Sequence, residues 1–445
     1  SAKAQQFGWG LVSFLGRVNY AYDSRFLFSL SARYDGSSRF DPSARWGLFP
    51  AMSAGWVLSK EKFLRNVDWL SSLKLRASYG ITGDQEIGDF QYLSYWTPSR
   101  YDGNAGLRPG TFGNPELTWQ RNRMLNVGVD FELFRGRLGG SLEFFKGNRT
   151  KLLAQAVLPA TSGFPSYTTN AGEIENKGVE FSILGTPVLN SRFSWTVNFN
   201  ISFIKDKILS LYSDNEQLST YKDLSPTHIL KVGYPVGTFI GYQYLGVDQQ
   251  TGMPSWGNEI VPLGKATPDY FGGLTNDLRF GSWDLSIATQ FSVGNKVMNL
   301  IRTTYQTLGN SPGGWDANNI LYQVFANNAT IVNNRWMKPG DRSDIPRASM
   351  IFANFNQQSS QFLENASFFR IRTINLGYTI RPKKQGKFNS LRLYGQIQNP
   401  WVFTKYYGFD PEVSSNGGSK PETAGVDYAA YPQARTFTFG LNFNF

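Results

Sequence analysis

The last ten residues of the chain alternate between apolar and small polar side chains. In an extended strand, successive side chains point to opposite faces. One face of residues 436–445 therefore carries only large apolar residues, namely Phe437, Phe439, Leu441, Phe443 and Phe445. The other face carries threonine, glycine and asparagine. A strand of about ten residues with one apolar, aromatic face is typical of a transmembrane β-barrel wall. A strand of a soluble sandwich alternates similarly, so one strand alone does not decide between them.

The same period-2 pattern recurs along the chain, which has no apolar run long enough for a membrane-spanning helix. It is clearest in residues 192–203. The sequence predicts an all-β fold, a transmembrane antiparallel β-barrel wall of about thirteen strands with long loops. The predicted strands are 12–22, 25–34, 46–58, 73–81, 125–133, 138–146, 178–186, 192–203, 271–280, 285–293, 371–380, 391–398 and 436–445.

Short and long connections alternate between these strands, as periplasmic turns and extracellular loops do in outer-membrane barrels. The long ones are 82–118, 147–177, 204–270, 294–367 and 400–435, and we place 59–70 and 381–390 on the short-turn side. Thirteen strands fit this alternation if residues 236–247 do not cross the membrane. An odd number does not close a standard even-stranded barrel. We therefore expect partner strands from another segment, about nine for a barrel of about 22 strands.

The amino-acid composition excludes several classes of function. The chain has no cysteine and one histidine, which excludes a disulfide framework and most histidine-based metal or nucleophile sites. The net charge of +11 comes from Lys and Arg scattered singly along the strands, without a nucleic-acid-binding motif. We expect these charges to face a lumen or the phosphates of outer-membrane lipid and lipopolysaccharide. No cofactor is expected, and calcium bound in a long loop stays open as an alternative.

Seven sequence segments, in this order, resemble the C-terminal part of the barrel of SusC/RagA-type TonB-linked outer-membrane transporters. The resemblance covers nearly the whole chain. In chain order they are Asn-Pro-Glu-Leu-Thr-Trp-Gln at 114–120, 232–252, 266–273, Trp-Met-Lys-Pro-Gly-Asp at 336–341 with Ile-Pro-Arg at 345–347, 366–378, 398–412 and Arg-Thr-Phe-Thr-Phe-Gly at 435–440. The sixth segment contains Gly-Phe-Asp-Pro-Glu at 408–412.

The resemblance implies active, TonB-energised import of an oligosaccharide or oligopeptide across the outer membrane of a Gram-negative bacterium, not catalysis. In that family a SusD/RagB-type lipoprotein covers the extracellular mouth, and a plug domain fills the lumen. We therefore interpret residues 1–445 as the C-terminal portion of the barrel, with the plug and N-terminal strands outside this chain. The alternatives are a passive porin and an outer-membrane hydrolase, which would need His228 and the nearby Ser225 to be part of a catalytic triad.

Candidate site residues lie in the long loops. Trp256, Trp315 and Trp336 are candidates for stacking on a sugar, with loop packing or contact with the lipoprotein as the alternative role. The 204–270, 294–367 and 400–435 loops are expected to contact the lipoprotein, and 296–308 and 318–330 are possible helices. An unstructured surface loop is the alternative for 294–367. Phe445, at the end of an apolar strand face, resembles the C-terminal assembly signal of outer-membrane barrels.

Overall fold

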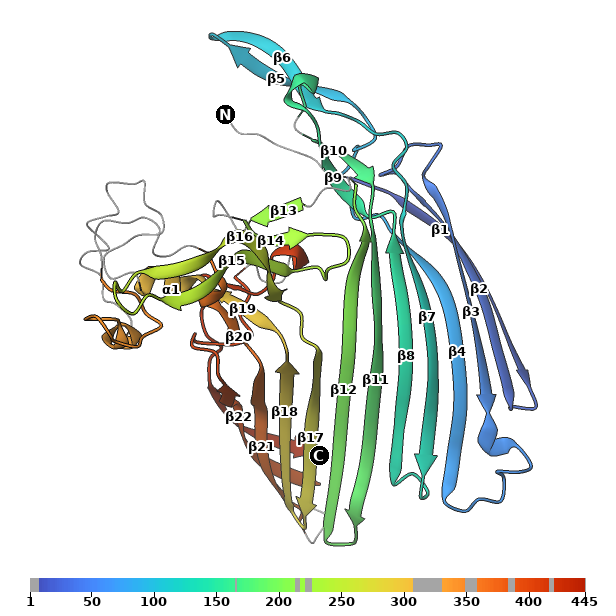
Figure 1. Cartoon of the computed structure of the whole chain (residues 1–445). Coiled ribbons are helices and arrows are strands. Elements are labelled where there is room, and N and C mark those ends of the chain that lie inside the picture. Colours follow the sequence, from blue (N-terminus) through green and yellow to red (C-terminus); the bar gives the residue numbers. More distant parts are fainter. Residues whose placement is uncertain are drawn as a thin grey trace. The chain divides into compact units, whose positions relative to one another are not determined.

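The computed structural model describes residues 8–164, 166–212, 217–220, 226–306, 330–348, 358–382, 389–415 and 420–444 (Figure 1). Two compact units make up the chain. The first comprises Ser1–Gly185 and Ile204–Asn215, and the second comprises Thr186–Phe203 and Glu216–Phe445. None of the helices among these residues is long and apolar enough to cross a membrane.

Thirteen strands form one antiparallel sheet in chain order, which confirms the predicted fold class and the predicted set of strands. They are β1 (Leu11–Tyr22), β2 (Phe26–Ser37), β3 (Trp46–Val57), β4 (Leu70–Asp84), β7 (Gln120–Leu133), β8 (Leu138–Thr150), β11 (Glu173–Leu189), β12 (Phe193–Ser210), β17 (Tyr270–Phe280), β18 (Trp283–Val293), β21 (Phe368–Ile380), β22 (Ser390–Thr404) and β24 (Thr436–Asn444).

Several strands are longer than predicted at the end that carries the long loops. β8 continues to Thr150, β11 begins at Glu173 and β12 continues to Ser210. The backbone ladder between β8 and β11 extends beyond the apolar residues, up to the pair Thr150 and Glu173. The sequence pattern marks the apolar band, whereas backbone hydrogen bonding sets the strand length.

The faces of the sheet follow the predicted alternation. In the first unit, one row crosses β1, β2, β3, β4 and β7 through directly paired residues with exposed apolar side chains: Val18, Leu30, Met52, Tyr79 and Leu125. The adjacent row on the opposite face is polar: Asn19, Ser29, Ser53, Ser78 and Asn126. A continuous exposed apolar face of this size fits contact with lipid.

We expect the two faces to respond differently to a buried charge. Val197 and Asn198 are neighbours on β12 and point to opposite faces. Val197→Arg should reduce the free energy of unfolding in a bilayer by about 2–4 kcal/mol, whereas Asn198→Arg should cost much less. Equilibrium unfolding of both variants in lipid vesicles measures the difference. Equal losses would contradict the face assignment.

Residues 236–247 are not part of the wall, as predicted. β15 (Thr238–Val247) belongs to a separate four-stranded sheet with β13 (Gln217–Thr220), β14 (Pro226–Leu230) and β16 (Pro254–Lys265). Three more short strands form another sheet: β19 (Lys296–Asn299), β20 (Leu363–Asn365) and β23 (Val426–Asp427). Two hairpins stand apart: β5 (Tyr95–Tyr101) with β6 (Asn104–Thr111), and β9 (Leu153–Val157) with β10 (Ser166–Asn170).

The predicted helix at 296–308 is mostly wrong. Of the described residues in this range, 296–306, α1 (Leu300–Tyr305) is helical, and the residues before it form β19. β19 pairs with β20 and β23, so tertiary pairing overrides the local helical pattern. The Asn299 side chain then caps α1 by accepting from the backbone N–H of Arg302. The predicted helix at 318–330 lies almost wholly outside the described residues. Phe445 also lies outside them, so the role of Phe445 as an assembly signal stays a prediction.

Candidate functional site

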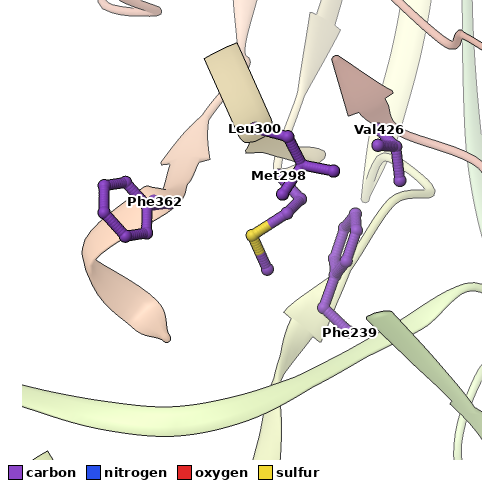
Figure 2. Close-up of a cluster of buried hydrophobic side chains, with 5 residues drawn as sticks. All are labelled: Phe239, Met298, Leu300, Phe362 and Val426. Carbon is purple, nitrogen blue, oxygen red and sulfur yellow. The ribbon is translucent and has the colours of Figure 1, made fainter. Parts of the chain in front are cut away.

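In the second unit, three long connections fold against one another. Phe239 comes from β15, Met298 and Leu300 from β19 and α1, Phe362 from the segment before β20, and Val426 from β23 (Figure 2). All five side chains are buried. The described parts of 294–367 therefore have a defined structure with their own apolar core, and the unstructured-loop alternative does not hold for them. We call this arrangement the loop assembly (residues 226–269, 294–306, 330–348, 358–367 and 405–435, as far as described).

Charged side chains also join these connections. Arg302 on α1 forms an ion pair of 2.8 Å with Glu364, and Asn299 donates to the same carboxylate. The hydroxyl of Tyr406 donates to the buried carboxylate of Asp427 at 2.6 Å. Burial, together with this hydrogen bond, raises the pKa of Tyr406. The Glu364 carboxylate also accepts from the backbone N–H of Tyr407 at 2.7 Å, which links residues 294–367 to residues 400–435.

An ionic network attaches residues 405–435 to the wall. Arg370 on β21 is almost completely buried and contacts the carboxylates of both Asp410 and Glu412. Arg372 hydrogen-bonds Glu412 and also donates to Gln290 of β18. The two acidic residues belong to the segment Gly-Phe-Asp-Pro-Glu at 408–412. The network explains why this segment needs its two carboxylates: they pair with the arginines of β21.

His228 is buried. Its Nε2 lies 2.9 Å from the Ala424 carbonyl and its Nδ1 2.8 Å from the Thr227 hydroxyl. Because a carbonyl only accepts, Nε2 carries the proton and Nδ1 accepts from Thr227. The ring packs on Phe239. Both ring nitrogens are therefore engaged in hydrogen bonds within the loop assembly, and these bonds give His228 a structural role. Ser225 lies outside the described residues.

Acid should loosen the loop assembly through this ring. Burial lowers the pKa of His228 to about 4, against the opposing hydrogen bond to Ala424. An unfolded histidine has a pKa of about 6.5, so between these values the unfolded state binds more protons. The contribution of the neutral His228 to the free energy of unfolding is therefore fully present above pH 6.5. It is lost as the pH falls towards 4, by up to about 3 kcal/mol.

Hydrogen exchange of residues 226–240, corrected for intrinsic rates, measures this effect at pH 7 and 4.5. We expect protection to fall at pH 4.5 in the wild type and to change much less in His228→Gln, whose amide retains a donor and an acceptor. An equal fall in both proteins would contradict the role of His228.

Trp336 holds a turn in place. Asp248 caps the turn that ends at Gly252, which has a φ of +70°. The Trp336 ring lies against Gly252, where a Cβ would collide with it. Its indole N–H donates to the Gln249 carbonyl at 2.9 Å, and only 8% of the residue is exposed. The structure gives Trp336 a packing role, and stacking on a sugar stays a prediction for it.

The other two candidate tryptophans have different settings. Trp256 on β16 is half-buried beside Tyr244, its partner on β15. Its indole Nε1 is buried and has no hydrogen-bond partner among the described residues. Trp315 lies outside the described residues. The assignment of Trp256 and Trp315 to substrate contacts stays a prediction.

The first unit contains a hairpin that the sequence analysis missed. β5 and β6 pair from Tyr95 to Thr111 around the two-residue turn Asp102–Gly103, in which both residues have positive φ. Trp96 and Leu107 lie on one face of this hairpin, 65% and 69% exposed. The Asp-Gly pair is a known signal for such a turn, so the hairpin was open to prediction. Its exposed apolar face is suited to contact with another molecule.

The second unit also exposes aromatic rings on the loop assembly. They lie between β22 and β24, where Tyr407 and Tyr428 are about half exposed, Phe409 more so and Tyr431 almost fully. Aromatic side chains are favoured in binding surfaces because they combine a large apolar area with few rotatable bonds. The sequence gives no local signal that separates these rings from buried neighbours such as Tyr406.

The N-terminal end of β7 is joined to its neighbouring loops by the segment at 114–120. Asn114 donates to the Thr168 carbonyl at 3.0 Å, and the backbone N–H of Thr118 donates to Asn170 at 2.8 Å. The indole of Trp119 donates to the Arg45 carbonyl at 2.8 Å and packs with Phe40 and Phe49 in a buried cluster.

Among the described residues, no three His, Asp or Glu side chains group closely enough to hold a metal ion.

Comparison with known proteins decides the family. A family model described as "TonB dependent receptor-like, beta-barrel" matches residues 1–300. The chain belongs to the TonB-dependent receptor family. This membership implies the outer membrane as its location.

TonB-dependent receptor SusC of Bacteroides thetaiotaomicron is 32% identical over 469 residues, which cover 98% of this chain and 44% of SusC. TonB-dependent receptor P3 of Formosa agariphila is 32% identical over 477 residues, 98% of this chain and 45% of the relative. The structure of the RagAB peptide transporter matches with a TM-score of 0.85 and 26% identity, over 98% of this chain and 48% of that chain. The chain of this TonB-dependent receptor thus spans about half the length of its relatives.

Proposed function

We propose that this chain forms part of the barrel of a TonB-energised importer in the outer membrane of a Gram-negative bacterium. The importer takes up a large nutrient, an oligosaccharide or an oligopeptide. The observation that carries this proposal is the match of nearly the whole chain to the RagAB peptide transporter, at a TM-score of 0.85. SusC, which is similar over the same extent of the chain, supports the same function class.

The two edges of the wall support a larger barrel. Among the described residues, β1 pairs only with β2, and β24 pairs only with β22. An unpaired strand edge in lipid leaves backbone N–H and C=O groups without partners, which costs several kcal/mol per group. We therefore propose that strands outside residues 1–445 pair with both edges, and that a plug domain in the same protein fills the lumen.

A surface lipoprotein of the SusD/RagB type is the proposed lid. In the first unit, the β5–β6 hairpin presents Trp96 and Leu107 on the long connection between β4 and β7. In the second unit, the loop assembly presents Phe409 and Tyr431 on the long connection between β22 and β24. Exposed apolar side chains of this size are uncommon on a surface that stays in water. Contact with a lid would bury them and would position the substrate between the two proteins.

Uptake that depends on TonB tests the proposal against the passive-porin alternative. The transporter is purified from the source bacterium, and its co-purified ligand is identified by mass spectrometry. Uptake of that ligand is then measured in cells with and without TonB, and with and without a chemical that collapses the proton gradient. We expect uptake to be lost without TonB and also when the proton gradient is collapsed. Unchanged uptake without TonB would contradict active import.

A further inference from the structure

A cluster of positive side chains lies on the lipid-facing side of four neighbouring strands in the first unit. The strands are β7, β8, β11 and β12, which follow one another in the sheet (Figure 1). The residues, which we call the basic belt, are Arg121, Arg123, Lys146, Lys177, Lys205 and Lys207. All six belong to the first unit, because residues 204–215 are part of it. Arg121 is half-buried and the other five are exposed.

The alternation of each strand places the basic belt on the same face as the apolar band. Arg123 is followed on its face by Leu125 and Val127, and Lys146 is preceded on its face by Phe144. Register confirms this, because Leu125 is directly opposite Lys146, and Lys146 is directly opposite Lys177. Lys205 follows the exposed Phe203 at the same spacing on β12. The belt therefore lies immediately beyond the apolar band, towards the long loops.

The carboxylates that the structure describes do not neutralise the cluster. Among the described residues, two carboxylates share its face, Glu173 and Glu175. Glu175 accepts from both Lys146 and Lys177, at 2.8 and 2.9 Å, and Glu173 accepts from Asn148. Two like charges directly opposite each other on paired strands are destabilising. Six positive charges against two negative ones leave an excess that an anion from outside the protein would balance.

We propose that the basic belt binds the phosphate groups of a phosphorylated glycolipid in the outer leaflet, a lipopolysaccharide. The site rests on the membrane placement of the proposed function, and it is independent of transport. The positive charges lie at the height of lipid headgroups, and the exposed Leu125, Phe144 and Val179 below them contact the acyl chains. A free phosphate ion would pair with the positive charges but would make no favourable contact with the apolar band.

Native mass spectrometry of the whole transporter in detergent tests the proposal. The probes are lipid A with its two phosphates, the same lipid A with the phosphates removed, and inorganic phosphate. We expect the phosphorylated lipid to bind at least tenfold more tightly than the dephosphorylated one. Inorganic phosphate should not displace it at equal concentration. Equal binding of both lipids, or displacement by inorganic phosphate, would overturn the proposal.

Variants locate the site. Lys146→Gln/Lys177→Gln/Lys205→Gln keeps hydrogen-bond donors near Glu175 but removes three charges. Each basic residue near an anionic surface contributes about a fivefold change in affinity, so about a 100-fold loss is expected. A second variant, Arg123→Gln/Lys205→Gln/Lys207→Gln, leaves the Glu175 pairs intact and should show a similar loss. The control, Lys60→Gln/Lys62→Gln/Arg65→Gln, removes three exposed charges between β3 and β4, at the opposite end of the strands.

The control should bind phosphorylated lipid A like the wild type. Wild-type affinity in both belt variants, or an equal loss in the control, would overturn the assignment. Because lipid binding is measured without uptake, the result is separate from the outcome of the TonB experiment.

Discussion

Replacing Arg370 with alanine is expected to destabilise the attachment of residues 405–415 to the wall by about 3–5 kcal/mol, the usual cost of breaking a buried ion pair. The size follows from the burial of both partners. Only 3% of Arg370 and 9% of Asp410 are exposed. Without the guanidinium, the carboxylate of Asp410 would remain buried without its partner cation. Glu412 would keep its contact with Arg372.

Hydrogen exchange of residues 405–415 measures this loss directly. Arg370→Met combined with Asp410→Leu removes both charges and should recover much of the stability, because the penalty comes from the unpaired charge. Lys265→Ala is the control, since the carboxylate that it leaves without a partner, Asp269, is 58% exposed, and it should cost less than about 1 kcal/mol. A cost in Arg370→Ala as small as in this control would contradict the anchoring role of the network.

Removing the apolar face of the β5–β6 hairpin is expected to weaken binding of the proposed lid by about 30-fold or more. Trp96 and Leu107 lie on the same face, since Trp96 pairs with Pro109 and Leu107 with Pro98. A tryptophan at the centre of an interface often contributes about 2 kcal/mol or more, which is about 30-fold in affinity. Trp96→Ser/Leu107→Ser should therefore release the lid and reduce uptake, while the barrel still inserts.

Co-purification of the lid with the tagged transporter measures retention. Thr97→Ala/Ser99→Ala is the matched control on the other face of the same hairpin. It should retain the lid. Full retention in the Trp96/Leu107 variant, at wild-type levels of inserted barrel, would remove the hairpin from the proposed lid contact.

The wall was predictable because each strand carries its own signal. In residues 193–203 the period-2 pattern identifies both the strand and its apolar face without knowledge of any neighbour. The parity of short and long connections then excluded residues 236–247 from the wall, and β15 indeed belongs to another sheet. Strand ends were less predictable, because the ladder continues past the apolar band into polar residues such as Glu173.

The loop assembly was not predictable in the same way, because it depends on contacts between distant residues. The partners of His228 are Thr227 and Ala424, and the second is 196 residues away. Trp336 is buried because it meets Gly252, and Asp410 because it meets Arg370. No local pattern distinguishes such residues from exposed loop residues of the same type. The segments at 114–120 and 408–412 were found by family resemblance, and the structure gives the physical reason for each.

Electron cryomicroscopy of the complete transporter, purified from the outer membrane with its partners, tests the central claim most directly. The claim is that residues 1–445 form one part of the wall of a larger barrel with a lid. We expect one additional strand paired with the free edge of β1, another paired with the free edge of β24, and a lipoprotein covering the long-loop end. Direct pairing of β1 with β24, which would close a barrel from this chain alone, would contradict the account.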